Sequence, residues 1–117
     1  MAGVDPRLIE VANLALQISP IDFGIPRDGG LRTTEVQQRL FDEGLSLLDG
    51  VNMKSYHQSG KALDFYAYVD GKASWDKHHM AIVGASFLQA AAALGYPLQW
   101  GGLWKSFKDY PHVQLVG

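Results

Sequence analysis

The sequence contains no cysteine. Disulfide bonds, thiolate metal ligands and a cysteine nucleophile are therefore excluded, and any metal ion must be bound by nitrogen and oxygen atoms. The sequence also lacks a run of about 18 apolar residues, which a membrane-spanning helix would require. Its formal net charge is only −2, which argues against electrostatic capture of nucleic acid or of an anionic membrane as the main activity.

The N-terminal segment, residues 1–20, lacks the basic start, the apolar stretch and the cleavage site of a signal peptide. We therefore expect the protein to stay in the cytoplasm until another factor releases it. The chain has 117 residues, of which 47% are hydrophobic and 19% charged, and this composition is typical of a globular protein. These values predict one domain that spans residues 1–117.

Three helices and a small sheet are predicted, which makes the fold class α+β. Asp5 followed by Pro6 is typical of a helix start, and apolar residues then recur at helical spacing over residues 6–18. The segment 23–34 is rich in glycine and is predicted to be a loop. A second helix is predicted over residues 34–48, and a third over residues 76–94, where Gly95 ends it.

The pattern changes to period two over residues 62–69, which predicts one strand with Asp64 on the face opposite Leu63. Asp70 and Gly71 then form a strong hairpin signal. Two further short strands are predicted in "LQWGG" and "HVQLV" near the C-terminus. We expect one small antiparallel sheet to carry the polar residues considered next.

The candidate chemical residues are histidines and carboxylates. His57, Asp64 and His112, with Asp109 as a spare carboxylate, could form a zinc site with a general base. The spacing alone leaves open that Asp64 is an ion-paired strand residue and His112 a core histidine. His78 and His79 are adjacent on a helix, so they diverge by about 100° and cannot easily share an ion.

A serine hydrolase is also conceivable, with Ser55 or Ser59 as the nucleophile. The sequence has no G-x-S-x-G pattern, which argues against that alternative.

Two segments resemble the zinc peptidases of the D-alanyl-D-alanine carboxypeptidase group. That group includes the vancomycin-resistance D,D-dipeptidases and the phage L-alanyl-D-glutamate endopeptidases. Its first motif, S-x-H-x-x-G-x-A-x-D, is matched without departure by Ser55, His57, Gly60, Ala62 and Asp64.

The second motif is an acidic residue followed three positions later by histidine, often with proline just before it; here these are Asp109, Pro111 and His112. An upstream arginine followed by Ser or Thr is matched by Arg32 and Thr33. The resemblance covers roughly residues 20–116.

The resemblance implies roles for the matched residues. His57, Asp64 and His112 would hold Zn²⁺, and Asp109 would be the general base. Arg32 would stabilise the oxyanion or bind a substrate carboxylate, and Ser55 would help to position the substrate. On this basis Gly60 and Ala62 are expected to be small because the metal and the substrate need room.

One position departs from the family pattern, because Val113 stands where an aromatic residue is common. We expect this departure to reshape the wall of the cleft. Gly101 and Gly102, beside Trp100 and Trp104, suit a shallow groove with stacking walls, although buried core tryptophans are the alternative.

The phage endolysin branch is the nearest within this group. It implies hydrolysis of the L-alanyl-D-glutamate bond in the stem peptides of bacterial peptidoglycan. For this chain we expect a monomer without a separate wall-binding domain. Lysis would then require breach of the membrane, as by a holin. The alternatives are a D-alanyl-D-alanine carboxypeptidase or dipeptidase, and a non-catalytic, metal-stabilised wall-binding module.

Overall fold

A computed structural model of the protein describes residues 3–26, 30, 60–105 and 108–116. The first helix, α1 (Pro6–Ile18), begins where the sequence predicts. The Asp5 side chain accepts a hydrogen bond from the backbone N–H of Arg7 at 2.9 Å, and proline at the first helical position needs no such partner. The buried face of α1 consists of the apolar residues at helical spacing, namely Leu8, Val11, Ala12 and Ala15.

The long helix α3 (Lys77–Leu94) also confirms the prediction. Asp76 caps its start through the backbone N–H of His78, and Gly95 ends it in the left-handed conformation at φ 77°. Gly84 lies against the indole of Trp100, because a Cβ at this position would stand 2.5 Å from Trp100 Cε2. The helix and the strand that carries Trp100 therefore approach closely. No helix among the described residues has the length and hydropathy to cross a membrane.

Within the described part of the chain the strands form two three-stranded antiparallel sheets, where the sequence predicted one. The first has the order β1-β3-β4, with strands Asp22–Gly24, Tyr66–Val69 and Lys72–Ser74. The second has the order β2-β6-β5, with strands Ala62–Asp64, His112–Leu115 and Leu98–Trp100, and a 3₁₀ turn, η2 (Gly101–Leu103), follows β5.

The predicted single strand over residues 62–69 is therefore wrong in one respect, since it is divided at Phe65. The backbone N–H of Phe65 donates to the carbonyl of Pro111 at 2.8 Å, after which the chain leaves β6 and pairs with β1. Strand β1 also lies at the start of the segment predicted as a loop. The helix predicted over residues 34–48 lies outside the described residues.

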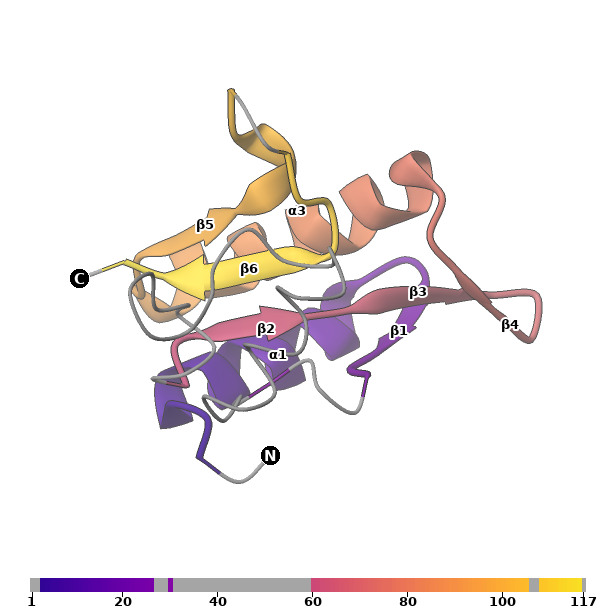
Figure 1. Cartoon of the computed structure of the whole chain (residues 1–117). Helices are drawn as coiled ribbons and strands as arrows, with labels where there is room; N and C mark the ends of the chain where they lie inside the picture. Colours follow the sequence, from indigo (N-terminus) through magenta and orange to yellow (C-terminus); the bar gives the residue numbers. More distant parts are fainter. Residues whose placement is uncertain (1–2, 27–29, 31–59, 106–107, 117) are drawn as a thin grey trace.

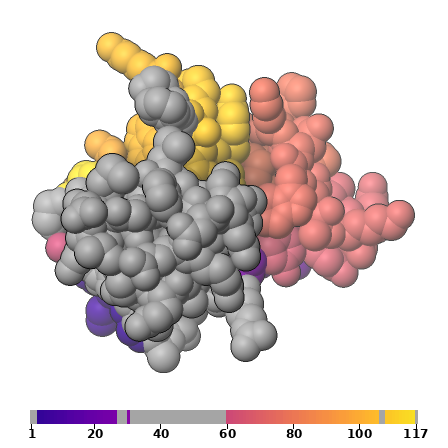
Figure 2. Space-filling view, viewed as in Figure 1, coloured from indigo at the N-terminus to yellow at the C-terminus, as the bar shows by residue number. Residues whose placement is uncertain are grey.

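The β3–β4 hairpin turns at Asp70 and Gly71, as predicted. Both residues have positive φ, 53° and 77°, which is the backbone that a tight two-residue hairpin turn requires. The hairpin projects from the rest of the described chain (Figures 1 and 2).

The hydrophobic core lies between α1, α3 and the sheet β2-β6-β5. In Figure 1, α1 and α3 both lie behind this sheet. Alternate strand residues, including Leu63, Val113 and Leu115, are fully or almost fully buried in this core. Phe65 adds a stacked contact with Phe87 of α3, with ring centroids 5.2 Å apart. Because side chains alternate along a strand, Asp64, His112 and Gln114 are presented on the other face of the sheet.

Candidate metal centre

The centre is built by the pairing of β2 with β6. The register places Asp64 directly opposite His112, so two residues 48 positions apart become cross-strand neighbours. Asp109 stands in the loop that enters β6, and its carbonyl accepts a hydrogen bond from the backbone N–H of His112 at 3.2 Å. The structure therefore brings together three of the four residues that the sequence predicts as metal ligands and base.

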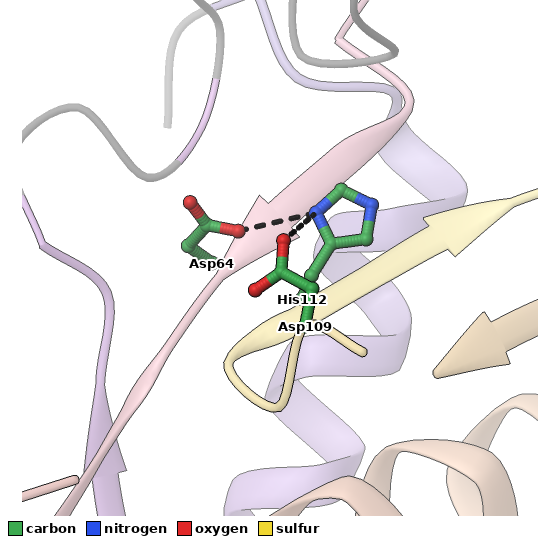
Figure 3. A group of neighbouring side chains, drawn as sticks. All are labelled: Asp64, Asp109 and His112. Atoms are coloured by element: carbon green, nitrogen blue, oxygen red, sulfur yellow. Dashed lines mark hydrogen bonds and ion pairs between the residues drawn. The ribbon is translucent and has the colours of Figure 1, made fainter. Parts of the chain in front are cut away.

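The side chains converge on one nitrogen of the His112 ring (Figure 3). Nδ1 lies 3.2 Å from Asp64 Oδ1 and 3.9 Å from Asp109 Oδ2. The other ring nitrogen, Nε2, lies 2.8 Å from Gln114 Oε1. The side chains of His112, Asp64 and Asp109 are 9%, 20% and 47% exposed, so the centre opens to solvent on the Asp109 side.

The electrostatics of this group favour a cation. Burial lowers the pKa of His112, but the hydrogen bond and negative charge of Asp64 act in the opposite direction. Gln114 and the charge of Asp109 add smaller contributions, and the pKa of His112 is raised above its ordinary value. Two carboxylates around one imidazole nitrogen thus stabilise positive charge at that point, whether a proton or a metal ion supplies it.

The loop that carries Asp109 is held against η2. The backbone N–H of Asp109 donates to the carbonyl of Gly101 at 3.1 Å, and the indole N–H of Trp100 donates to the carbonyl of Tyr110 at 2.7 Å. A Cβ on Gly101 would overlap the carbonyl oxygen of Asp109. Glycine is needed here because the two backbones touch, and the position of Asp109 depends on that contact.

The expectation of a groove lined by Gly101, Gly102 and two stacking tryptophans is therefore wrong in part. Both glycines are buried, and Trp100 is a core residue that is 7% exposed. Trp104 alone lies beside the centre, with its ring centroid 5.3 Å from that of His112. One tryptophan, and not two, is placed to contact a molecule bound at this centre.

The structure also gives Gly60, Ala62 and Val113 surroundings that differ from those expected from the sequence. Gly60 has φ 73°, and a Cβ there would overlap the carbonyl oxygen of Gly3, so glycine is required by the backbone and by packing against the N-terminal segment. Ala62 is fully buried and lies opposite Gln114. Val113 faces the core with no exposed surface, so it does not form a wall of the cleft.

The adjacent histidines on α3 point to different partners. His78 Nδ1 lies 3.3 Å from Asp76 Oδ1 on the surface, whereas His79 Nδ1 lies 2.7 Å from the hydroxyl of Ser74. Among the described residues, Asp64, Asp109 and His112 are the group that could hold a metal ion. Arg32, Ser55 and His57, with Ser59, lie outside the described residues, so their predicted roles stay predictions.

The donor atoms fit a zinc ion. Bonds of about 2.0–2.1 Å at tetrahedral angles put neighbouring ligand atoms roughly 3.3 Å apart. Asp64 Oδ1 and His112 Nδ1, at 3.2 Å, match that separation, and one potential ligand atom from each of the three residues lies within 4.8 Å of the others. Nitrogen and oxygen donors of this kind suit Zn²⁺.

Comparison with known proteins decides the family. A sequence profile of the phage L-alanyl-D-glutamate peptidases matches residues 1–115. The chain belongs to this family. It is 38% identical over 128 residues to the L-alanyl-D-glutamate peptidase of Escherichia phage T5, in a match that covers 99% of this chain and 91% of that protein. It is 31% identical to the peptidoglycan L-alanyl-D-glutamate endopeptidase CwlK of Bacillus subtilis, over 74% of this chain and 58% of that protein.

Solved structures agree with this assignment. The L-Ala D-Glu endopeptidase ChiX of Serratia marcescens superposes with a TM-score of 0.86 at 35% identity, over 97% of this chain and 81% of that one. The vancomycin-resistance D,D-pentapeptidase VanY, solved in complex with Zn(II), superposes with a TM-score of 0.69 at 18% identity, over 97% and 73%. The second likeness is one of fold, and it confirms the predicted α+β class.

Sequence reasoning missed Gln114 as a neighbour of the centre. The spacing of two residues from His112 on a predicted strand was a usable signal, because residues i and i+2 of a strand share a face. Trp104 was considered only as part of a groove, and its contact with His112 depends on the turn η2, which the sequence pattern does not predict.

Proposed function

We propose that this chain is a zinc-dependent endopeptidase that hydrolyses the L-alanyl-D-glutamate bond in the stem peptides of bacterial peptidoglycan. The observation that carries the proposal is the group formed by Asp64, Asp109 and His112 in a member of a family of L-alanyl-D-glutamate peptidases. The named activities of the T5, CwlK and ChiX proteins supply the substrate.

The three side chains differ in a way that supports a division of roles. Asp64 and His112 are the more buried pair and are separated by 3.2 Å, as expected for two ligands of one ion. Asp109 is 47% exposed and lies 3.9 Å from Nδ1, so its carboxylate can face both the ion and solvent. With His57 as the third ligand, the fourth position of a catalytic zinc site would remain for water.

A bound zinc ion would polarise the scissile carbonyl and make a water molecule a stronger nucleophile near neutral pH. Asp109 would accept the proton of the attacking water and deliver it to the amine of D-glutamate as the peptide bond breaks. Arg32 would stabilise the negative charge on the carbonyl oxygen or bind a substrate carboxylate, and Ser55 would help to position the stem peptide.

Product analysis tests the proposal directly. Purified peptidoglycan digested by the zinc-loaded protein should yield peptides with a new N-terminal D-glutamate, and glycan strands that still carry L-alanine, as identified by mass spectrometry. His112→Ala should abolish the release, whereas His79→Ala, which changes a histidine away from the centre, should not. Release of free D-alanine would indicate a carboxypeptidase, and the absence of any released fragment would contradict an enzymatic function.

A further inference from the structure

The two ring nitrogens of His112 face different groups. Nδ1 faces the carboxylates of Asp64 and Asp109, and Figure 3 shows both contacts meeting at this one atom. Nε2 lies 2.8 Å from the amide oxygen of Gln114, well within hydrogen-bond distance. The geometry therefore assigns one nitrogen to the metal side and the other to the amide.

An imidazole can bind a metal ion only through a nitrogen that carries no proton. In a neutral ring the other nitrogen then carries the proton, and a hydrogen-bond acceptor at that position fixes both the tautomer and the orientation of the ring. The amide oxygen of Gln114 is such an acceptor, because it has lone pairs and no proton to donate. In the metal-bound form, the pair Nε2–H and Oε1 thus leaves the lone pair of Nδ1 to an ion held between this nitrogen and the carboxylates of Asp64 and Asp109.

The sheet explains why Gln114 can do this. Gln114 follows His112 by two residues on β6, so their side chains share a face. On β2 the residue opposite Gln114 is Ala62, a small buried residue that leaves room for the amide. The imidazole is 9% exposed, and a hydrogen bond in such a buried environment of low dielectric constant is stronger than one in water.

We propose that Gln114 is a positioning residue of the metal centre, which holds His112 in the Nε2–H form and directs Nδ1 at the ion. This inference rests on the zinc site of the proposed function. It adds a residue that neither motif of the sequence contains.

The first measurement uses the wild-type protein loaded with zinc. Nitrogen-15 NMR of the histidine rings should show His112 protonated at Nε2, with an N–H signal that exchanges slowly with water because it is hydrogen-bonded. If His112 carried its proton on Nδ1 in the zinc-loaded protein, the proposal would be wrong, regardless of the zinc affinity of any variant.

The second measurement is the zinc affinity of matched variants, determined by competition with a chelator. Gln114→Met keeps the length of the side chain and removes the acceptor, and it should weaken zinc binding about 10–100-fold, the range typical of outer-shell partners. Gln114→Glu keeps an acceptor at this position and should bind zinc about as tightly as the parent. The control is Gln99→Met, because Gln99 is the exposed cross-strand neighbour of Gln114 on β5.

The outcomes separate this inference from the proposed function. Equal zinc affinity of Gln114→Met and Gln99→Met, with the N–H of His112 still protected, would refute the role of Gln114 and leave the peptidase intact. Zinc bound through Nδ1 in a wild-type protein that releases no wall peptide would refute the peptidase and leave the role of Gln114 intact.

Discussion

Replacing each of the two carboxylates near His112 in turn should separate metal binding from catalysis. Asp109→Asn keeps the size of the side chain and removes the group that accepts a proton. General-base assistance contributes about 10²–10⁴-fold, so kcat/KM should fall by that factor, equivalent to about 3–5 kcal/mol in the barrier. Asp109 is half-exposed and 3.9 Å from Nδ1, so the loss of its charge should weaken zinc binding by no more than about tenfold.

Asp64→Asn should instead act mainly on zinc binding. Asp64 is 20% exposed and 3.2 Å from Nδ1, in the position of a ligand. Its loss should weaken zinc binding by more than the roughly 10–100-fold typical of outer-shell partners. In the metal-free protein it should also lower the pKa of His112 more than Asp109→Asn does, because Asp64 contributes both a hydrogen bond and a charge to that imidazole and Asp109 only a charge.

The assay combines bound zinc per chain, hydrolysis of purified stem peptides at saturating zinc, and NMR titration of His112 with the metal removed. Full activity of Asp109→Asn would show that another group takes the proton. A loss of zinc from Asp109→Asn as complete as that from Asp64→Asn would make Asp109 a ligand, and the division of roles would be wrong.

Two further predictions concern pH and packing. Because the pKa of His112 is raised in the folded metal-free protein, its contribution to stability is present below the unfolded value of about 6.5 and is lost as pH rises through the folded value. Thermal unfolding in the presence of a chelator should therefore show stability that falls from about pH 6.5 upward. Zinc affinity should rise over the same pH interval, because protons compete with zinc for Nδ1. The same trend in both measurements would contradict this account. Gly84→Ala should destabilise the protein in urea unfolding by up to about 2 kcal/mol, since the clash with Trp100 outweighs a gain of about 1 kcal/mol in helix propensity. A more stable variant would show that the indole can move away without cost.

Local signals were enough to predict α1 and α3. Both ends of α3 carry strong signals, Asp76 before its first turn and Gly95 after its last, and α1 begins with aspartate and proline. Strand β1 is only three residues long in a segment rich in glycine and proline, and it forms because β3 pairs with it. Pairing between distant strands leaves no local pattern, so β1 and the break at Phe65 could not be predicted.

The residues of the centre were predictable from motifs and not from periodicity. The pattern in "SYHQSGKALDF" and "KDYPHVQL" identifies Asp64, Asp109 and His112, whereas composition and spacing alone left an ion pair and a core histidine open as explanations. What the motifs do not reveal is the reason for each small residue. Gly60 and Gly101 are glycines because backbones touch there, and Val113 faces the core because it alternates with His112.

The ion-pair explanation and the metal explanation of Asp64 are not alternatives in this fold. Asp64 does pair with His112, and His112 is nearly buried, so both parts of the simpler interpretation describe the structure. The same pair has the donor atoms and the spacing that zinc requires. A proton on Nδ1 and a metal ion would therefore occupy one electrostatic position, between the same carboxylates. Each can offset the repulsion of Asp64 and Asp109 when the other is absent, so the arrangement of the centre need not depend on the metal, whereas the proposed hydrolysis does.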